Sequence, residues 1–395
     1  MIHPLFVYLF FVDLASLYEQ TYKKYSIREP KYGVAWLEAY LFAYQYSGQK
    51  GRLSHELILG THKKAMAWQN PTNSALAGHY KNCHNHFQAH PSHVLYEGLY
   101  CLNQTYNMSH EGVHQFIDKN LTEHCTYQTT IVFTISDSEN SCIQRQLFVE
   151  SFNPETHLFH YVEFENQTLE SSDAKDSLTI HQLVDSYLQN STVSIKIYPA
   201  EKLSVSEIHL ATKAQMTTII DNFNQNIESC RTDEERFKTI INTIQQIDQC
   251  HPFIDGNIRC CYILLNKLLD DFNLGKTLLY NPNGFDLYTL EELYDLVKQG
   301  QTHYRKLYLH QSSAPFKYQY NILGYDASVN CLPQNMPDVS DALLQQFQSV
   351  VIAQEPRLSQ PIQAAKLGLF TAKPHFCKND SMNQLIEEGS YNQAL

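Results

Sequence analysis

The chain has 395 residues, which is long enough for two or three domains with a substantial core. Its 29 lysines and arginines against 41 aspartates and glutamates give a net charge of −12, which argues against a nucleic-acid backbone as the partner. Ten cysteines with no Cys-x-x-Cys pair indicate reduced, mostly buried thiols and a reducing compartment.

The first 52 residues are expected to form an aromatic, helical N-terminal segment. Its opening apolar run lacks a basic start, and Asp13 interrupts it after roughly a dozen residues. Because a transmembrane helix needs about 20 apolar residues, the run indicates a buried first helix rather than a membrane span.

Residues 53–68 have the pattern of an amphipathic helix that carries histidine, and a short Gly-x-Tyr-basic turn follows at residues 77–82. From residue 83 to about 190 the pattern changes. The segments TTIVFTIS, RQLFVESF and HLFHYVEFE alternate and are rich in β-branched and aromatic residues, as half-buried strands are. We therefore expect a mixed segment inserted between this early helix and a later core.

A cluster of possible metal ligands lies at the start of this inserted segment. It consists of Cys83, His84, His86, His90 and His93. The spacing matches no standard zinc finger, and a chain with 19 histidines forms such clusters without a metal, so a structural interpretation is preferred.

A short strand is predicted to end at Pro199, and two capping boxes after it predict the starts of two helices. Ser204 with Glu207, and Thr232 with Glu235, have the Ser/Thr-x-x-Glu spacing in which side chain and backbone cap each other. Isoleucines at helical spacing follow the second box. The second helix should stop near Pro252, because proline lacks an N–H donor.

The segment HPFIDGNIR, residues 251–259, therefore joins two predicted helices as a tight loop. The start of the second helix offers free N–H groups and the positive end of the helix dipole, and Gly256 allows a ligand close to the backbone. The loop carries His251 as a candidate base, Asp255 as a candidate metal ligand and Arg259 as a fixed cation. This combination suggests phosphoryl or nucleotidyl transfer.

These residues resemble the signature of the Fic domain family, His-x-Phe-x-(Asp or Glu)-Gly-Asn-(Gly or Lys)-Arg-x-x-Arg, which also joins two helices. The resemblance implies that His251 takes the proton of a Ser, Thr or Tyr hydroxyl on a target protein, and that Asp255 holds Mg²⁺. It implies a donor site formed by Phe253, Gly256, Asn257, Ile258, Arg259 and Tyr262. Strand addition at a β-hairpin flap would dock the target on Val193, Ser194, Ile195 and Lys196.

Two positions depart from the family pattern: Ile258 replaces its small or lysine residue, and Tyr262 replaces its second arginine. In the family that arginine commonly holds the terminal phosphate of ATP or pairs with an inhibitory glutamate. Tyr262 could hydrogen-bond a phosphate or stack on a base, but it cannot replace a bidentate cation. The resemblance favours AMP transfer from ATP, with phosphocholine transfer from CDP-choline as the alternative that the departure supports; a binding scaffold without activity is the third interpretation.

The remaining sequence adds one helix from about Thr289 and an appended helical or partly extended tail at residues 311–395. Neither the stretch His93 to Gly98 nor Gln384 to Gly389 matches the family's inhibitory motif. The acidic, apolar end could be an export signal, although a solvated tail is the preferred interpretation.

We therefore predict a mainly α fold with a Fic-type helical core, a short β-hairpin flap, an inserted α+β segment and a C-terminal helical tail. The expected parts are an N-terminal helical segment at 1–52, the first part of the core at 53–82, the insertion at 83–184, the main core at 185–310 and the extension at 311–395. The expected partners are a nucleotide and a target protein, without nucleic acid or a membrane span. Resemblance to effector-type members suggests a bacterial cytoplasm before export, and then the cytosol of a host cell.

Overall fold

The computed structural model of the chain describes residues 31–68, 76–82, 87–89, 111–112, 115, 129–136, 142–153, 158–165, 168–170, 193–199, 204–279, 282–286, 288–310 and 339–352. The predictions for the opening apolar run, for the histidine cluster at its five positions, for the two near-inhibitory stretches and for the acidic end lie outside these residues.

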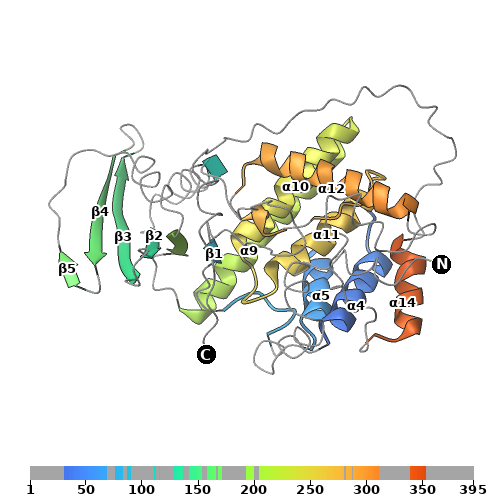
Figure 1. Cartoon of the computed structure of the whole chain (residues 1–395), viewed down its shortest axis with the longest axis horizontal. Coiled ribbons are helices and arrows are strands. Elements are labelled where there is room, and N and C mark those ends of the chain that lie inside the picture. Colours follow the sequence, from blue (N-terminus) through green and yellow to red (C-terminus); the bar gives the residue numbers. More distant parts are fainter. Residues whose placement is uncertain are drawn as a thin grey trace, which may run out of the picture. The chain divides into compact units, whose positions relative to one another are not determined.

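Helix α11, Asn257–Asp271, lies at the centre of a helical core (Figure 1). It packs against α10, Asp233–Cys250, on one side and against α5, His55–Ala65, and α4, Tyr32–Gln45, on the other. Twelve of its 15 residues are buried, so this helix has almost no solvent-facing side. The described helices therefore form the mainly helical core that the sequence predicts.

Helix α10 packs against α11 and also against α9, Val205–Ser229, and α12, Leu290–His310. Its four central isoleucines are completely buried, and each stabilises the fold by roughly 1.5–3 kcal/mol relative to an exposed side chain. They are Ile240, Ile241, Ile244 and Ile247. Both predicted capping boxes are formed, at Ser204 for α9 and at Thr232 for α10.

Part of the predicted C-terminal extension belongs to this core. Helix α14, Asp341–Phe347, continues into a π-helical turn, Gln348–Ile352, and both pack on α4. The ring of Phe347 meets that of Tyr40 edge to face, with centroids 5.6 Å apart. The segment at 339–352 therefore differs from the appended tail that the sequence suggests, because it buries apolar residues against the first described helix. The five-part division of the chain itself stays a prediction.

The described strands form one antiparallel sheet with the order β1-β6-β2-β3-β4-β5. Strands β2, β3 and β4 coincide with the three segments that alternate in the sequence, and β3 carries a register shift between Val149 and Ser151. The strands are β1 Phe87–Ala89, β2 Thr129–Ser136, β3 Cys142–Asn153, β4 Leu158–Glu165, β5 Thr168–Glu170 and β6 Val193–Pro199.

Strand β6 is the strand on which the flap was predicted. It pairs with β2 along its whole length and with β1 from Ile195 to Ile197. Both edges of Ile195 and Lys196 are therefore occupied, and an added strand there would have to displace β1. The docking role of Val193, Ser194, Ile195 and Lys196 stays a prediction.

None of the described helices has the length and hydropathy needed to cross a bilayer. Four cysteines have described side chains: Cys250, Cys260 and Cys261 are buried and Cys230 is half-buried, all as free thiols. Burial raises the pKa of the Cys260 and Cys261 thiols, so both stay protonated. The three thiols beside the HPFIDGNIR loop fill the core, as the sequence predicts.

Candidate active site

His251 stands where α10 ends, in the left-handed region of backbone space at φ 43° and ψ 60°. Its backbone N–H donates to the carbonyl of Asp248 at 2.9 Å, which closes the last turn of the helix. A left-handed conformation costs a residue other than glycine about 1–2 kcal/mol, and the following Pro252 cannot extend the helix. This turn holds the imidazole on the loop rather than on a face of α10.

The side chain of Asn257 closes the loop across its base. Its Oδ1 accepts the N–H of Phe253 at 2.9 Å, and its Nδ2 donates to the carbonyl of Phe253 at 3.0 Å. The same Nδ2 lies 3.2 Å from Nδ1 of His251. Asn257, which is 6% exposed, therefore fixes both the loop and the candidate base.

An aromatic stack supports the loop from beneath. The ring of Phe253 stacks on that of His62, with centroids 3.7 Å apart, and on that of Tyr80, with centroids 5.9 Å apart. Phe253 is completely buried, so it anchors the loop in the core. Lys81 adds two bonds, from its backbone N–H to the carbonyl of Pro252 at 2.8 Å and from Nζ to the carbonyl of Cys250 at 3.0 Å.

His62 is a buried residue that holds the part of the loop where Asp255, the candidate metal ligand, lies. The N–H of Gly78 donates to its Nδ1 at 3.0 Å, so its Nε2 carries the proton and donates to the carbonyl of Asp255 at 2.8 Å. Burial lowers the pKa of His62 to about 4, because it disfavours the charged ring. His62 is therefore neutral near pH 7.

The N-terminus of α11 begins at Gly256, without a side-chain cap. Gly256 has φ +73°, and a β-carbon there would collide with the sulfur of Met66. Its N–H donates to Oδ1 of Asp255 at 2.6 Å, and the Asp255 side chain is exposed. A carboxylate and an uncapped helix N-terminus therefore lie side by side at the surface of the loop.

The far end of the motif turns inward. Arg259 is 7% exposed; its guanidinium lies 4.7 Å from the ring of Tyr32 and its Nη1 donates to the sulfur of Met66 at 3.5 Å. Ile258 is half-buried against the core.

Tyr262 is not brought to the surface of the loop. The side chain is 1% exposed, and its hydroxyl donates to the carbonyl of Thr277 at 3.2 Å and accepts the N–H of Leu279 at 2.9 Å. Contact with a donor phosphate or base would require both backbone bonds to break, so Tyr262 has a structural function in this arrangement.

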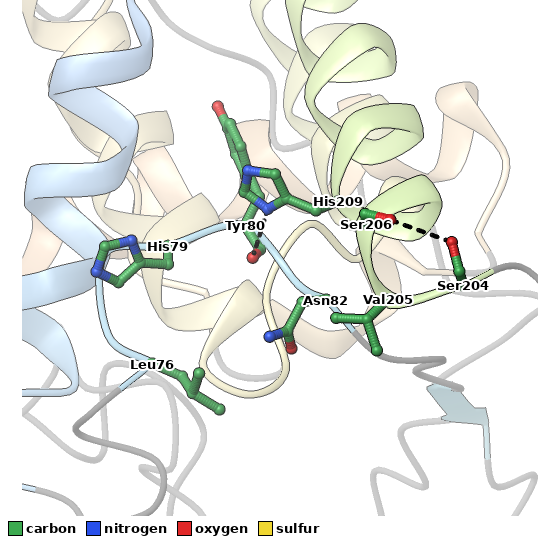
Figure 2. Close-up of a pocket in the computed structure, with 8 residues that line it drawn as sticks. All are labelled: Leu76, His79, Tyr80, Asn82, Ser204, Val205, Ser206 and His209. Carbon is green, nitrogen blue, oxygen red and sulfur yellow. Dashed lines mark hydrogen bonds between the residues drawn. The ribbon is translucent and has the colours of Figure 1, made fainter.

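A cavity of about 690 Å³ lies between the segment 76–82 and the first turns of α9 (Figure 2). His209 reaches from α9 to the carbonyl of Tyr80 at 3.3 Å, and Val205 and Leu76 supply apolar surface. The described lining contains no lysine, arginine, aspartate or glutamate, so the cavity is poorly suited to phosphate. It adjoins the loop through Tyr80 but does not include His251 or Asp255.

No protein-family model matches the chain. A curated relative does: over 83 residues the chain is 39% identical to phosphocholine transferase AnkX of Legionella pneumophila. The alignment covers 21% of this chain and only 9% of AnkX, so the similarity concerns a small part of that protein.

Three residues of the site lie outside the HPFIDGNIR motif. Asp286 lies with its Oδ1 at 3.1 Å from Nε2 of His251, and His62 and Met66 support Asp255 and Gly256. The amphipathic pattern at 53–68, which carries His55 and His62, is the one hint that the sequence offers for His62. The other two contacts join residues that are 35 and 190 positions apart, so no motif reveals them.

Proposed function

We propose that this chain is a Fic-type transferase, which moves a phosphate-containing group from a nucleotide donor to a Ser, Thr or Tyr hydroxyl of a target protein. The observation that carries the proposal is the loop itself: a histidine with a hydrogen-bonded ring stands beside an uncapped helix N-terminus and an exposed carboxylate. The similarity to a phosphocholine transferase supports the transferase class.

In the proposed reaction the target hydroxyl oxygen forms a bond to a phosphorus atom of the donor, and the bond from that phosphorus to the leaving phosphate breaks. His251 accepts the hydroxyl proton, and the leaving phosphate takes the electron pair. The N–H groups at the start of α11 stabilise the charge that develops on the transferred phosphoryl oxygens.

Mg²⁺ fits the proposed site as a partner of the donor rather than as a resident ion. Among the described residues no group of three His, Cys, Asp or Glu side chains could hold a metal. One exposed carboxylate, Asp255, is nevertheless what Mg²⁺ uses when substrate phosphates supply further ligands. The ion would neutralise charge on the donor phosphates.

Arg259 is proposed to hold the phosphate on the leaving side. In the described arrangement its guanidinium lies on Tyr32, so this function requires the side chain to swing away from that ring. If it stays there, Arg259 acts by fixing Met66 beneath Gly256, which makes it a residue that positions the loop.

Two donors fit the proposal. AMP transfer from ATP follows from the family resemblance, and phosphocholine transfer from CDP-choline follows from two observations. The first is the similarity to AnkX, and the second is the buried Tyr262, which leaves no cation at the position that clamps a terminal phosphate. A donor that ends at its β-phosphate needs no such clamp. The target, its cellular location and export into a host cell remain predictions from the resemblance.

Intact-mass measurement on target-cell proteins incubated with the full chain, Mg²⁺ and either ATP or CDP-choline tests the proposal. A gain of about 329 Da identifies AMP and about 165 Da identifies phosphocholine. His251→Ala, checked by its melting curve to be folded, should give no gain. Transfer by that variant at the wild-type rate overturns the mechanism, and no gain with any donor leaves a binding scaffold.

A further inference from the structure

Asp286 meets the candidate base from outside the motif. It follows the 3-10 turn η1, Pro282–Phe285, and its Oδ1 lies 3.1 Å from Nε2 of His251. The two side chains are 15% and 17% exposed, so the contact is largely shielded from water. A carboxylate so placed resembles the group that orients the histidine in many acid–base sites.

The hydrogen-bond network assigns the proton on the His251 ring. Asn257 presents its Oδ1 to the N–H of Phe253 and its Nδ2 to the Phe253 carbonyl, so its amide cannot be turned round without losing both bonds. The group that faces Nδ1 of His251 is therefore an N–H donor, and Nδ1 holds a lone pair. The ring proton is on Nε2, where Asp286 accepts it.

Helix α10 also fixes the backbone that carries Asp286. Gln249 donates from Nε2 to the carbonyl of Asp286 at 3.1 Å, and Gln245, one turn earlier, donates to the carbonyl of Tyr288 at 2.7 Å. The helix that ends at His251 therefore also holds the segment that supplies its carboxylate. The pair is built on one rigid element, as an orienting contact requires.

A second carboxyl group, that of Asp248, lies beside Asp286. Asp248 is 1% exposed, beside Asp286 and the thiol of Cys261, and neither of its oxygens has a hydrogen bond of normal geometry to a described residue. Burial, and next the charge of Asp286, raise the pKa of Asp248 well above its usual range. Asp248 is therefore a neutral acid, and Asp286 is the carboxyl group that contacts His251.

We infer that Asp286 is the positioning residue of His251: it holds Nε2–H so that Nδ1 is the atom that accepts the target's proton. The target hydroxyl then approaches Nδ1 beside Nδ2 of Asn257, and the Asp286 side chain at Nε2 stabilises the imidazolium that forms. This inference rests on the proposed function, but its first test does not, because the ring proton can be observed without any donor.

The test compares Asp286→Ala with Asp295→Ala, which removes an exposed aspartate from α12 and leaves the loop untouched. In the proton NMR spectrum, wild type and Asp295→Ala should show a slowly exchanging, downfield Nε2–H of His251, assigned by its loss in His251→Ala. Asp286→Ala should lack it. Asp286→Asn, which keeps the shape, serves if the alanine variant does not fold, and it should show faster exchange of the same proton.

Donor consumption, measured with ATP and with CDP-choline, supplies the second readout. Asp286→Ala should lower kcat by roughly 10- to 100-fold, the scale known for partners that orient metal-bound histidines, while KM for the donor changes less than about twofold. Formate should restore part of the rate to Asp286→Ala and none to His251→Ala. An unchanged ring proton or an unchanged kcat in Asp286→Ala overturns the inference, whereas a wild-type chain that consumes neither donor overturns the proposed function and leaves the NMR result standing.

Discussion

Two helix N-termini in the same core are built in opposite ways. Helix α10 begins with a capping box in which Thr232 and Glu235 satisfy each other's backbone N–H groups at 3.1 and 3.0 Å. Helix α11 begins at Gly256 with no side-chain cap, although a good cap stabilises a helix by about 1 kcal/mol. The first terminus is capped by its own side chains, whereas the second is open only in the sense that no side chain caps it, and residues distant in the chain support it.

The open terminus depends on residues that are distant in the chain. Met66 lies under Gly256, His62 holds the carbonyl of Asp255, and Asp286 holds His251. An uncapped N-terminus leaves backbone donors available for an anion. The difference between α10 and α11 is therefore the one that the proposed phosphate site requires.

Gly256→Ala should break the open terminus with the largest effect. The alanine would have to adopt the left-handed backbone conformation, and its β-carbon would collide with the Met66 sulfur. We therefore expect a loss of about 2–5 kcal/mol in the free energy of unfolding. Gly275→Ala is the matched control, because it has φ +87° but its nearest neighbour is Arg305 at 3.6 Å. It should cost only about 1–2 kcal/mol.

Urea titration of the two variants measures this difference. Equal losses would show that the Met66 contact yields without strain, and the account of Gly256 would then reduce to backbone conformation alone. Adding Met66→Ala to Gly256→Ala should recover the part of the Gly256→Ala stability loss that exceeds the Gly275→Ala loss. The recovery is reduced by the free energy that the cavity left by the Met66 side chain costs.

His62 should make the support of the loop sensitive to acid. Its pKa of about 4 in the fold lies below the usual value near 6.5, so the unfolded chain binds the proton first as pH falls. The contribution of neutral His62 to the free energy of unfolding is fully present above pH 6.5. It is lost as the pH falls from 6.5 to about 4, by up to about 3 kcal/mol.

The variant His62→Gln isolates this effect, because groups common to both proteins cancel in the difference. His62→Gln should be less stable at pH 7, since the stack on Phe253 is lost, and the gap to wild type should narrow as pH falls. A gap that stays constant from pH 7 to pH 4 contradicts a neutral, buried His62. Free energies of unfolding from urea curves at each pH provide the measurement.

Asp248→Asn should change stability in the opposite pH direction. The native chain keeps a proton on Asp248 that the unfolded chain releases above about pH 4, so wild type loses stability as pH rises, by no more than about 1.4 kcal/mol per pH unit. Asparagine imitates the neutral acid without this loss. We expect the variant to be the more stable protein at pH 7–8, with a gain that grows with pH; a variant that shows no such gain would mean that Asp248 is ionised in the fold.

The closed terminus and the open one also differ in what the sequence reveals. The capping boxes at Thr232 and Ser204 could be predicted because their partners are three residues apart, and so could the loop that begins at Pro252. Asp286 could not be predicted, because only the hydrogen bonds of α10 to the backbone of Asp286 and Tyr288 bring it to His251. Phe347 was missed for the same reason, since its partner Tyr40 lies near the other end of the described chain.

The motif also could not predict that the Tyr262 side chain is buried in the core. A motif states which residue types recur, but the direction of a side chain depends on the neighbours of α11. Here Thr277 and Leu279 offer backbone groups that satisfy the phenol inside the core. The sequence therefore predicted the loop and its place between two helices, and not the residues that orient its side chains.

Thr232→Ala should have the smallest effect, and it tests the closed side of the comparison. Removing the hydroxyl leaves the N–H of Glu235 without its acceptor, which should cost about 1 kcal/mol in the free energy of unfolding. Thr232→Ser keeps the hydroxyl and should cost only a few tenths of that. Because the cap is exposed and lies at the far end of α10 from His251, neither variant should change donor consumption or the Nε2–H resonance of His251. A loss of either signal in Thr232→Ala would show that α10 transmits strain to the loop, and the two termini would then be coupled rather than independent.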